Sequence, residues 1–196
     1  MLFPNSFCGH YRMGEFSMKK FFSMKDVFSA RNLAIMALLA ALEVVLARYT
    51  TIHLTQQLTL ISFEYLPASI VSALFGPWAA IVFGIVSDSL GYFSNPIGPY
   101  LPVYAISQVV ANLIEAAFMY QGKFDWWRII VARLLVMLIV IMGLNFLWQV
   151  IYYGAAAAKY YNSVRIIGNL IQLPIQVILI RFFGKLSFRI LQRQQH

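Results

Sequence analysis

The sequence predicts an all-α integral membrane protein, built as a bundle of six transmembrane helices. Of its 196 residues, 61 % are hydrophobic and 11 % carry a charge, with a mean hydropathy of +0.72; soluble domains are less apolar and more charged. A helix needs roughly 20 apolar residues to cross a hydrocarbon core about 30 Å thick. The chain therefore has room for about six spans and for no large soluble domain.

Turn residues and polar breaks divide the apolar part of the chain into helices. A polar break after Tyr49 ends the first helix, and Gly76-Pro77, a turn dipeptide with a helix breaker, separates the second from the third. The segment 91–102 holds two Gly and three Pro and separates the third from the fourth. A QGKFDWWR turn and an Ala-rich turn with Lys159 follow. The expected helices cover residues 30–49, 58–75, 78–90, 103–120, 129–153 and 163–183.

We expect three regions along the chain. Residues 1–25 form a cytoplasmic or interfacial extension, because they lack the continuous apolar core of a signal peptide. Residues 26–185 form the six-helix transmembrane domain, and residues 186–196 form a basic cytoplasmic tail. The single cysteine, Cys8, excludes an intrachain disulfide bond.

The lysine and arginine residues orient the bundle. With an even number of spans, both termini lie on one side of the membrane, together with the turn between the fourth and fifth helices. Most basic residues gather there, and the opposite side holds only Arg48, Lys159 and Arg165. The positive-inside rule therefore puts both termini in the cytoplasm of a multi-pass cell-membrane protein. Because the cations lie at the ends of apolar segments, we attribute the net charge of +8 to membrane topology and expect no nucleic-acid partner.

Two polar stripes lie inside the last two apolar segments. One has the spacing i, i+3, i+4 and i+7 and the other i, i+4, i+7 and i+11, so each set shares one helix face. Polar groups are costly in hydrocarbon, and the stripes are expected to face each other or a wet cavity, which we take as the ligand site. The stripes are Asn145, Trp148, Gln149 and Tyr152, then Arg165, Asn169, Gln172 and Gln176.

The candidate ligand-binding residues are aromatic, amide and cationic side chains on the outer half of the bundle. The rings suit a flat ring or an acyl chain, and the amides offer both donors and acceptors. Cations on the outer side suit a carboxylate. Aromatic residues of the 91–102 loop also fit an interfacial belt with no ligand. The candidates are Arg48, His53, Asn95, Tyr100, Tyr104, Asn145, Trp148, Tyr152, Arg165, Asn169 and Gln172.

The chain shows no apparatus for catalysis. It has no phosphate-binding Gly-x-x-x-x-Gly-Lys loop and no Gly-x-Ser-x-Gly elbow. Its three histidines lie far apart, without the spacing of a metal site. We therefore expect no catalytic residue, metal or cofactor in this chain. Of the ionisable groups in the spans, Glu115 and Arg133 flank one turn and are expected to pair structurally, while Glu43, Glu64 and Asp88 stay functional candidates.

Small residues form a stripe on the first helix. Ala30, Ala34, Ala37 and Ala41 share a face there, and such spacing lets another helix approach closely, because helices in lipid associate through packing. Packing inside the bundle and docking of a partner both explain the stripe.

The order of several segments resembles the substrate-binding S component of energy-coupling-factor (ECF) vitamin transporters, in the folate-type branch. The resemblance covers about residues 27–183. The segments are ALLAALEVVLARY, ISFEYLPASIVSALFGPWAAIVFGIVSDSLG, PIGPYLP, LNFLW and VRIIGNLIQLPIQ.

The resemblance implies a prokaryotic membrane protein that captures a water-soluble vitamin at the outer face. Folate is the first choice, and pantothenate or another carboxylate vitamin the alternative. The implied partners are an EcfT-type transmembrane coupling subunit, which meets the family's Ala-x-x-x-Ala motif at Ala37 and Ala41, and two cytoplasmic ATPase subunits, which bind ATP and Mg²⁺. A membrane-embedded enzyme acting on lipids or prenyl groups is the alternative from another class; it would need clustered carboxylates or histidines.

Overall fold

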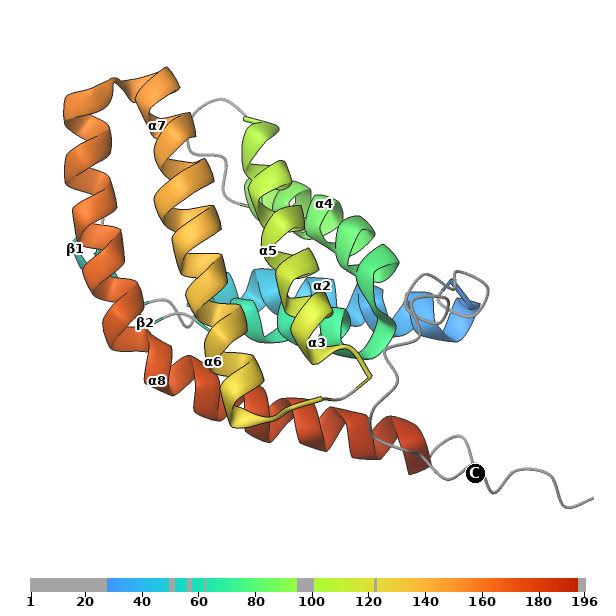
Figure 1. The fold of residues 1–196 in the computed structure, drawn as a ribbon. Coiled ribbons are helices and arrows are strands. Elements are labelled where there is room, and N and C mark those ends of the chain that lie inside the picture. Colours follow the sequence, from blue (N-terminus) through green and yellow to red (C-terminus); the bar gives the residue numbers. More distant parts are fainter. Residues whose placement is uncertain are drawn as a thin grey trace, which may run out of the picture.

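The computed structural model describes residues 28–49, 52–55, 58–61, 63–94, 101–121 and 123–193. Within these ranges the chain forms one small hairpin and six helices, one of which consists of the three consecutive segments α6, η1 and α7, so the predicted helical membrane bundle is confirmed (Figure 1). The elements are α2 (Ala30–Tyr49), β1 (Ile52–Thr55), β2 (Leu58–Ile61), α3 (Tyr65–Phe75), α4 (Pro77–Ser94), α5 (Val103–Met119), α6 (Trp126–Leu135), η1 (Val136–Asn145), α7 (Phe146–Tyr153) and α8 (Ala155–Arg193).

Three helical stretches are long and apolar enough to cross a membrane. They are Ala30–Ala47, Trp126–Tyr152 and Ile166–Ile190. The helix α3 has 11 residues, or about 16 Å of rise at 1.5 Å per residue, which is half of a hydrocarbon core. Nearly all of its residues are buried, so α3 is surrounded by protein and does not need the length of a lipid-facing span.

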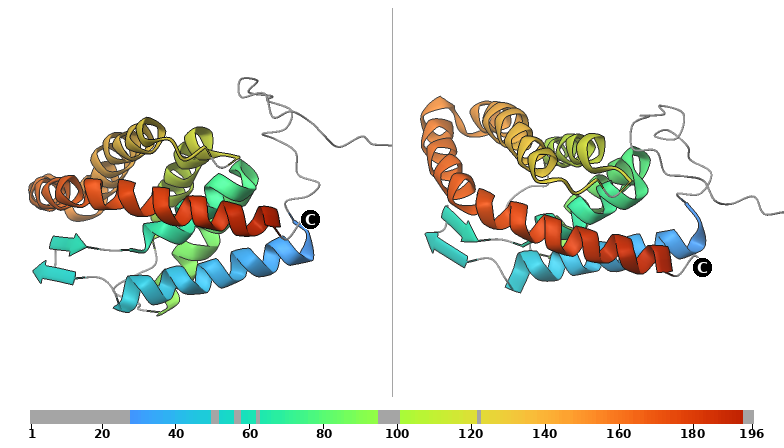
Figure 2. Two further views of the ribbon diagram at one scale, coloured as in Figure 1. Left: turned by 90° about the horizontal axis from the view of Figure 1, so that it is seen from below. Right: turned by 60° about the horizontal axis from the view of Figure 1, so that its bottom comes forward.

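The hairpin replaces the first turn of an expected helix. The segment Leu58–Ile61, predicted to begin the second helix, is instead a strand that pairs antiparallel with Ile52–Thr55. The sequence IHLT…LTLI alternates apolar and polar residues, a period of two that favours a strand over a helix. Figure 2 shows the hairpin at the opposite end of the bundle from the C-terminal end of α8.

Two helices are longer than predicted. α4 continues through Gly91 to Ser94, and α8 begins at Ala155, where we expected a turn, and ends at Arg193, beyond Phe183. Alanine has the highest helix propensity, so the run Ala155–Ala158 starts the helix. Gly184 does not end α8, because it lies buried against the ring of Phe124, where an added Cβ would overlap that ring.

The fifth helix contains a π-helical segment. α6, η1 and α7 follow one another as one long helix, and α8 runs back beside it and curves past the lower end of α6 (Figure 1). η1 has 10 residues and ends at Asn145, the first residue of a polar stripe. π-Helical segments are rare in proteins, and those that occur often lie at functional sites.

Two apolar clusters form the core, and α3 contributes to both. In the first, Met36 and Ala40 of α2 pack against Val71 of α3 and Phe83 of α4. In the second, residues of α3, α5, α6 and α8 pack together around Ile180. A backbone hydrogen bond of 3.0 Å from Gln121 N to Ala73 O also fastens the turn after α5 to α3.

Candidate functional site

Among the stripe residues whose side chains the structure describes, all but Tyr152 are buried or half-buried. Gln149 is 4 % exposed, and Gln172 and Gln176 are each 5 % exposed. Asn145, Trp148 and Asn169 are half-buried. Tyr152 is 48 % exposed and does not join the others. Because α7 and α8 pack against each other, the two stripes line one region; their role as ligand contacts stays a prediction.

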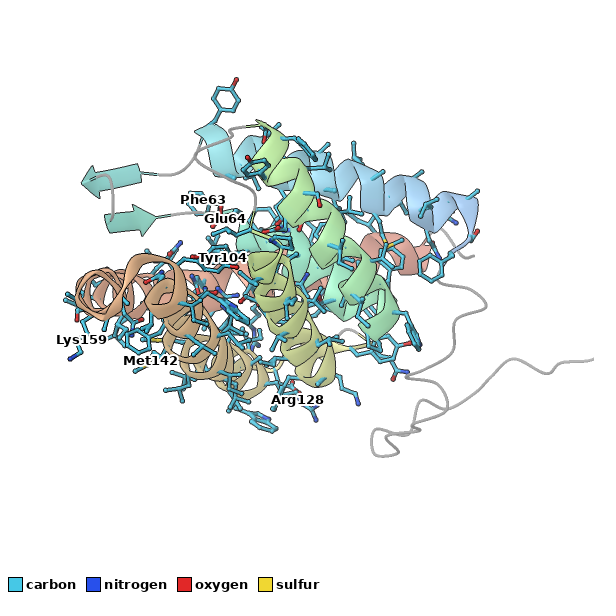
Figure 3. The ribbon with its side chains drawn as sticks, turned by 90° about the horizontal axis from the view of Figure 1, so that it is seen from above. Phe63, Glu64, Tyr104, Arg128, Met142 and Lys159 are labelled. Carbon is cyan, nitrogen blue, oxygen red and sulfur yellow. The ribbon has the colours of Figure 1, made fainter. Side chains whose placement is uncertain are left out.

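A hydrogen bond between α7 and α5 orients the indole of this region. Trp148 Nε1 donates to Ser107 Oγ at 3.1 Å, and Ser107 is fully buried. Tyr104 lies one turn earlier on α5 and is half-buried; it is labelled in the view from above (Figure 3). Sequence reasoning missed Ser107, and its only signal there is the i+3 spacing from Tyr104.

Two amide oxygens, one at the end of η1 and one on α7, are buried and have no hydrogen-bond partner among the described residues. They are Asn145 Oδ1 and Gln149 Oε1. A buried acceptor left unpaired costs about 1–3 kcal/mol, so native proteins pair such groups with few exceptions. A bound molecule with N–H or O–H groups would satisfy both atoms. This face of α7 therefore offers acceptors beside the aromatic ring of Trp148.

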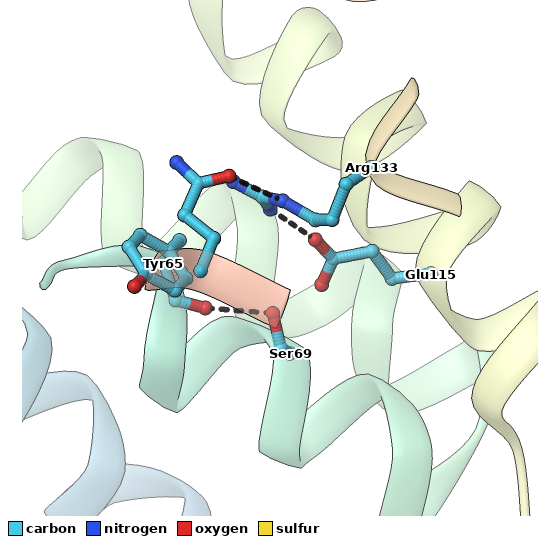
Figure 4. Close-up of polar contacts among 5 residues, drawn as sticks. Tyr65, Ser69, Glu115 and Arg133 are labelled. Atoms are coloured by element: carbon cyan, nitrogen blue, oxygen red, sulfur yellow. Dashed lines mark hydrogen bonds and ion pairs between the residues drawn. The ribbon is translucent and has the colours of Figure 1, made fainter. Parts of the chain in front are cut away.

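A buried polar cluster joins four helices next to this region (Figure 4). Arg133 of α6 pairs with Glu115 of α5 through Nη1 and donates from Nε to Oε1 of Gln176 on α8 at 2.9 Å. Its guanidinium also lies 4.8 Å from the ring centroid of Tyr65 on α3, a cation–π contact. The predicted structural pair of Glu115 and Arg133 is confirmed. Gln176, the last residue of the α8 stripe, is held by this cluster.

The other ionisable candidates are Glu43 on α2, Glu64 directly before α3 and Asp88 on α4. Glu43 is buried and hydrogen-bonds Ser87, whereas Glu64 is exposed and Asp88 is half-buried. In the part of the chain that the structure describes, no three His, Cys, Asp or Glu side chains come close enough to hold a metal ion.

Five predicted site residues are described only in part or not at all. Asn95 and Tyr100 lie outside the described residues. The structure describes only the backbone of three others, which are Arg48 in α2, His53 in β1 and Arg165 in α8.

The alanine stripe of α2 faces outward. Ala34, Ala37 and Ala41 are exposed, whereas Ala40, on the other face, is 2 % exposed and belongs to the core. The interpretation of the stripe as internal packing is therefore wrong for Ala37 and Ala41. Both residues remain available to lipid or to a partner helix.

The fold and the site define a helical membrane protein. Among the described residues, three glutamines and the Glu115–Arg133 ion pair are buried inside the bundle, while many large apolar side chains are exposed on its outer surface. The chain belongs to the family of substrate-specific components of ECF transporters, whose family model matches residues 31–181.

Relatives and a solved structure support this membership. The folate transporter FolT of Clostridium novyi (strain NT) is 30 % identical over 145 residues, 74 % of this chain and 83 % of the relative. FolT of Leuconostoc mesenteroides is 31 % identical over 152 residues, 75 % of this chain and 80 % of the relative. A crystal structure of FolT bound with folic acid matches with a TM-score of 0.70 and 32 % identity, over 80 % of this chain and 93 % of that one.

Proposed function

We propose that this chain is the folate-binding component of an ECF importer, and that the inward face of α7 is central to its site. The observation that carries the proposal is the hydrogen-bonded Trp148 beside two buried acceptors, Asn145 Oδ1 and Gln149 Oε1, that have no partner in the described part of the chain. The similarity to folate transporters, and to FolT bound with folic acid, favours folate among the vitamins.

The chemistry of folate fits these groups. Its pterin is a flat ring with amino and ring N–H donors, so it can stack on the indole of Trp148 while it donates to the amide oxygens. Its glutamate tail carries two carboxylates, which suit Arg48 and Arg165 as charge-assisted partners. Pantothenate has one carboxylate and no aromatic ring, and it makes poorer use of this face.

Import needs a complex. We infer that the exposed face around Ala37 and Ala41 docks an EcfT-type transmembrane coupling subunit, and that two cytoplasmic ATPase subunits hydrolyse ATP for transport. The small residues allow close approach of a partner helix. The excess of basic residues toward the termini favours a cytoplasmic location for both ends. The chain itself binds the vitamin and carries out no chemical step.

Titration of the purified chain tests this function. Folic acid and pantothenate are titrated separately by calorimetry into the protein in detergent, and quenching of tryptophan fluorescence is followed in parallel. We expect saturable binding of folic acid with quenching, and at least tenfold weaker binding of pantothenate. Tight pantothenate binding without a folic acid signal would contradict the assignment of the vitamin. Turnover of a lipid by the chain alone would contradict the transporter role.

A further inference from the structure

Cations and indole rings form a patch where α6 begins beside α8. The guanidinium of Arg181 lies 4.3 Å from the ring centroid of Trp126, and that of Arg128 lies 5.4 Å from the ring centroid of Trp127. Trp126 and Trp127 are 48 % and 58 % exposed. A guanidinium over an aromatic face keeps the N–H donors at its edge, so Arg181 can still pair with an anion.

The α8 side of this patch carries several positive charges, and the described part of α8 holds no acidic residue that would offset them. Arg181, Lys185 and Arg189 follow one another at i, i+4 and i+8 and so share one helix face. α8 contains no Asp or Glu, and the whole sequence after Asp125 contains none. Asp125 itself is paired with Arg128 at 3.3 Å. Lys185 and Arg189 are exposed, so this face attracts an anion.

Large apolar side chains are exposed on the same part of α8. Phe182, Phe183 and Leu186 lie between the cations in the sequence, Ile190 follows Arg189, and all four are exposed. A molecule that satisfies this surface therefore carries a negative group and an apolar tail. Indole rings are also enriched at the level of lipid headgroups.

We propose that this patch, made of Trp126, Trp127, Arg128, Arg181, Lys185 and Arg189, binds an anionic phospholipid. The phosphate pairs with the cations of α8, and the acyl chains lie on the neighbouring phenylalanine and leucine side chains. Basic sites between helices recognise acidic headgroups in the leaflet where Lys and Arg gather. The patch is separate from Trp148 and the amide stripes, so the inference stands independently of the vitamin.

Native mass spectrometry tests the proposal. The purified full chain in mild detergent receives phosphatidylglycerol and phosphatidylcholine in equal amounts, and the retained lipid is counted. We expect several-fold more phosphatidylglycerol on the unmodified chain. The double variant Arg181→Gln with Lys185→Gln should lower its retention by about fivefold for each charge removed.

The matched control is Lys159→Gln, which removes an exposed cation from the same helix. Lys159 lies near the start of α8, at the other end of the long helix pair from Arg128 (Figure 3). This variant should retain phosphatidylglycerol as the unmodified chain does. Arg181→Lys keeps the charge but loses the flat stack on Trp126, so its retention should fall between those of the unmodified chain and the double variant.

Three outcomes would overturn the proposal. They are equal retention of the two lipids by the unmodified chain, an equal loss in Lys159→Gln, and full displacement of the lipid by soluble glycerol phosphate at the same concentration. The comparison of lipids on the unmodified chain needs no variant, so a variant that misfolds does not remove the test. Folic acid titration of the Arg181 and Lys185 variants reports separately on the vitamin site, and their affinity for folic acid should not change.

Discussion

Arg133 and Glu115, 18 residues apart in the sequence, form an ion pair inside the bundle, with side chains 10 % and 3 % exposed. The pair links α6 to α5, and Gln176 extends it to α8. Charges buried this deeply are tolerated only when they are paired and hydrogen-bonded. The pair therefore fixes the relative positions of the helices that carry the polar stripes.

Replacing one member of the pair should destabilise the bundle. Glu115→Leu leaves the guanidinium of Arg133 buried without its counter-ion, and breaking a buried pair this way costs about 3–5 kcal/mol. The double variant Glu115→Leu with Arg133→Met removes both charges and should regain most of that loss. Thermal unfolding of each variant in the same detergent measures the effect. A double variant less stable than the single one would show that the pair is not coupled in this way.

The bond between Trp148 and Ser107 should position the indole for the vitamin. Ser107→Ala leaves the indole N–H unpaired, and we expect the dissociation constant of folic acid to rise about fivefold, the equivalent of about 1 kcal/mol. Trp148→Phe keeps a ring and removes the N–H. In a double-mutant cycle the two changes should be less than additive, because they remove one interaction. Additive losses in the titration would mean that the two residues act separately.

The unpaired oxygen of Gln149 should have opposite effects on binding and stability. Gln149→Leu removes a buried acceptor at similar volume, so the free protein should be as stable or more stable. Folic acid affinity should fall by about 1–3 kcal/mol if a vitamin N–H group donates to this oxygen. Thermal unfolding without ligand and calorimetric titration measure the two quantities. A parallel loss of stability and affinity would assign Gln149 to the core instead.

The two faces of α2 should respond differently to the same substitution. Ala37→Leu enlarges an exposed side chain, so the isolated chain should keep its stability and its folic acid affinity, while ATP-dependent uptake by the full complex is lost because the partner helix cannot approach. Ala40→Leu, on the buried face, overpacks the core and should destabilise the isolated chain by about 1–3 kcal/mol. Unfolding curves and vesicle uptake distinguish these results. Normal uptake by Ala37→Leu would exclude this face as the docking surface.

Hydropathy and helical spacing predict most of the helices and the inward-facing stripes, but they do not predict most contacts between helices. The stripes of α7 and α8 could be predicted because hydrocarbon rejects amides, so their spacing alone points inward. The pair of Glu115 and Arg133 followed from their shared turn. Ser107 could not be found, because one serine in an apolar helix has many roles and its partner is 41 residues away.

Local pattern also misplaces some boundaries. Leu58–Ile61 is continuous in the sequence with the apolar residues that follow it, so the segment resembles the start of a helix. The strand becomes evident only when the alternation of apolar and polar residues from Ile52 onward is considered. The π-helical bonding of η1 has no sequence signal that we can name. Tyr152 shares a predicted face with Gln149, yet it lies on the surface, because a helix face is wider than the contact that covers it.

The short helix α3 has a consequence for how the molecule melts. It supplies Val71 to the apolar cluster shared with α2 and Leu66 to the apolar cluster shared with α8, so both clusters depend on its packing. If the helices of either cluster separate, α3 loses half of its packing contacts, and the other cluster is destabilised as well. Heating should therefore give a single cooperative transition, in which the cluster around α2 and the cluster around α8 unfold together.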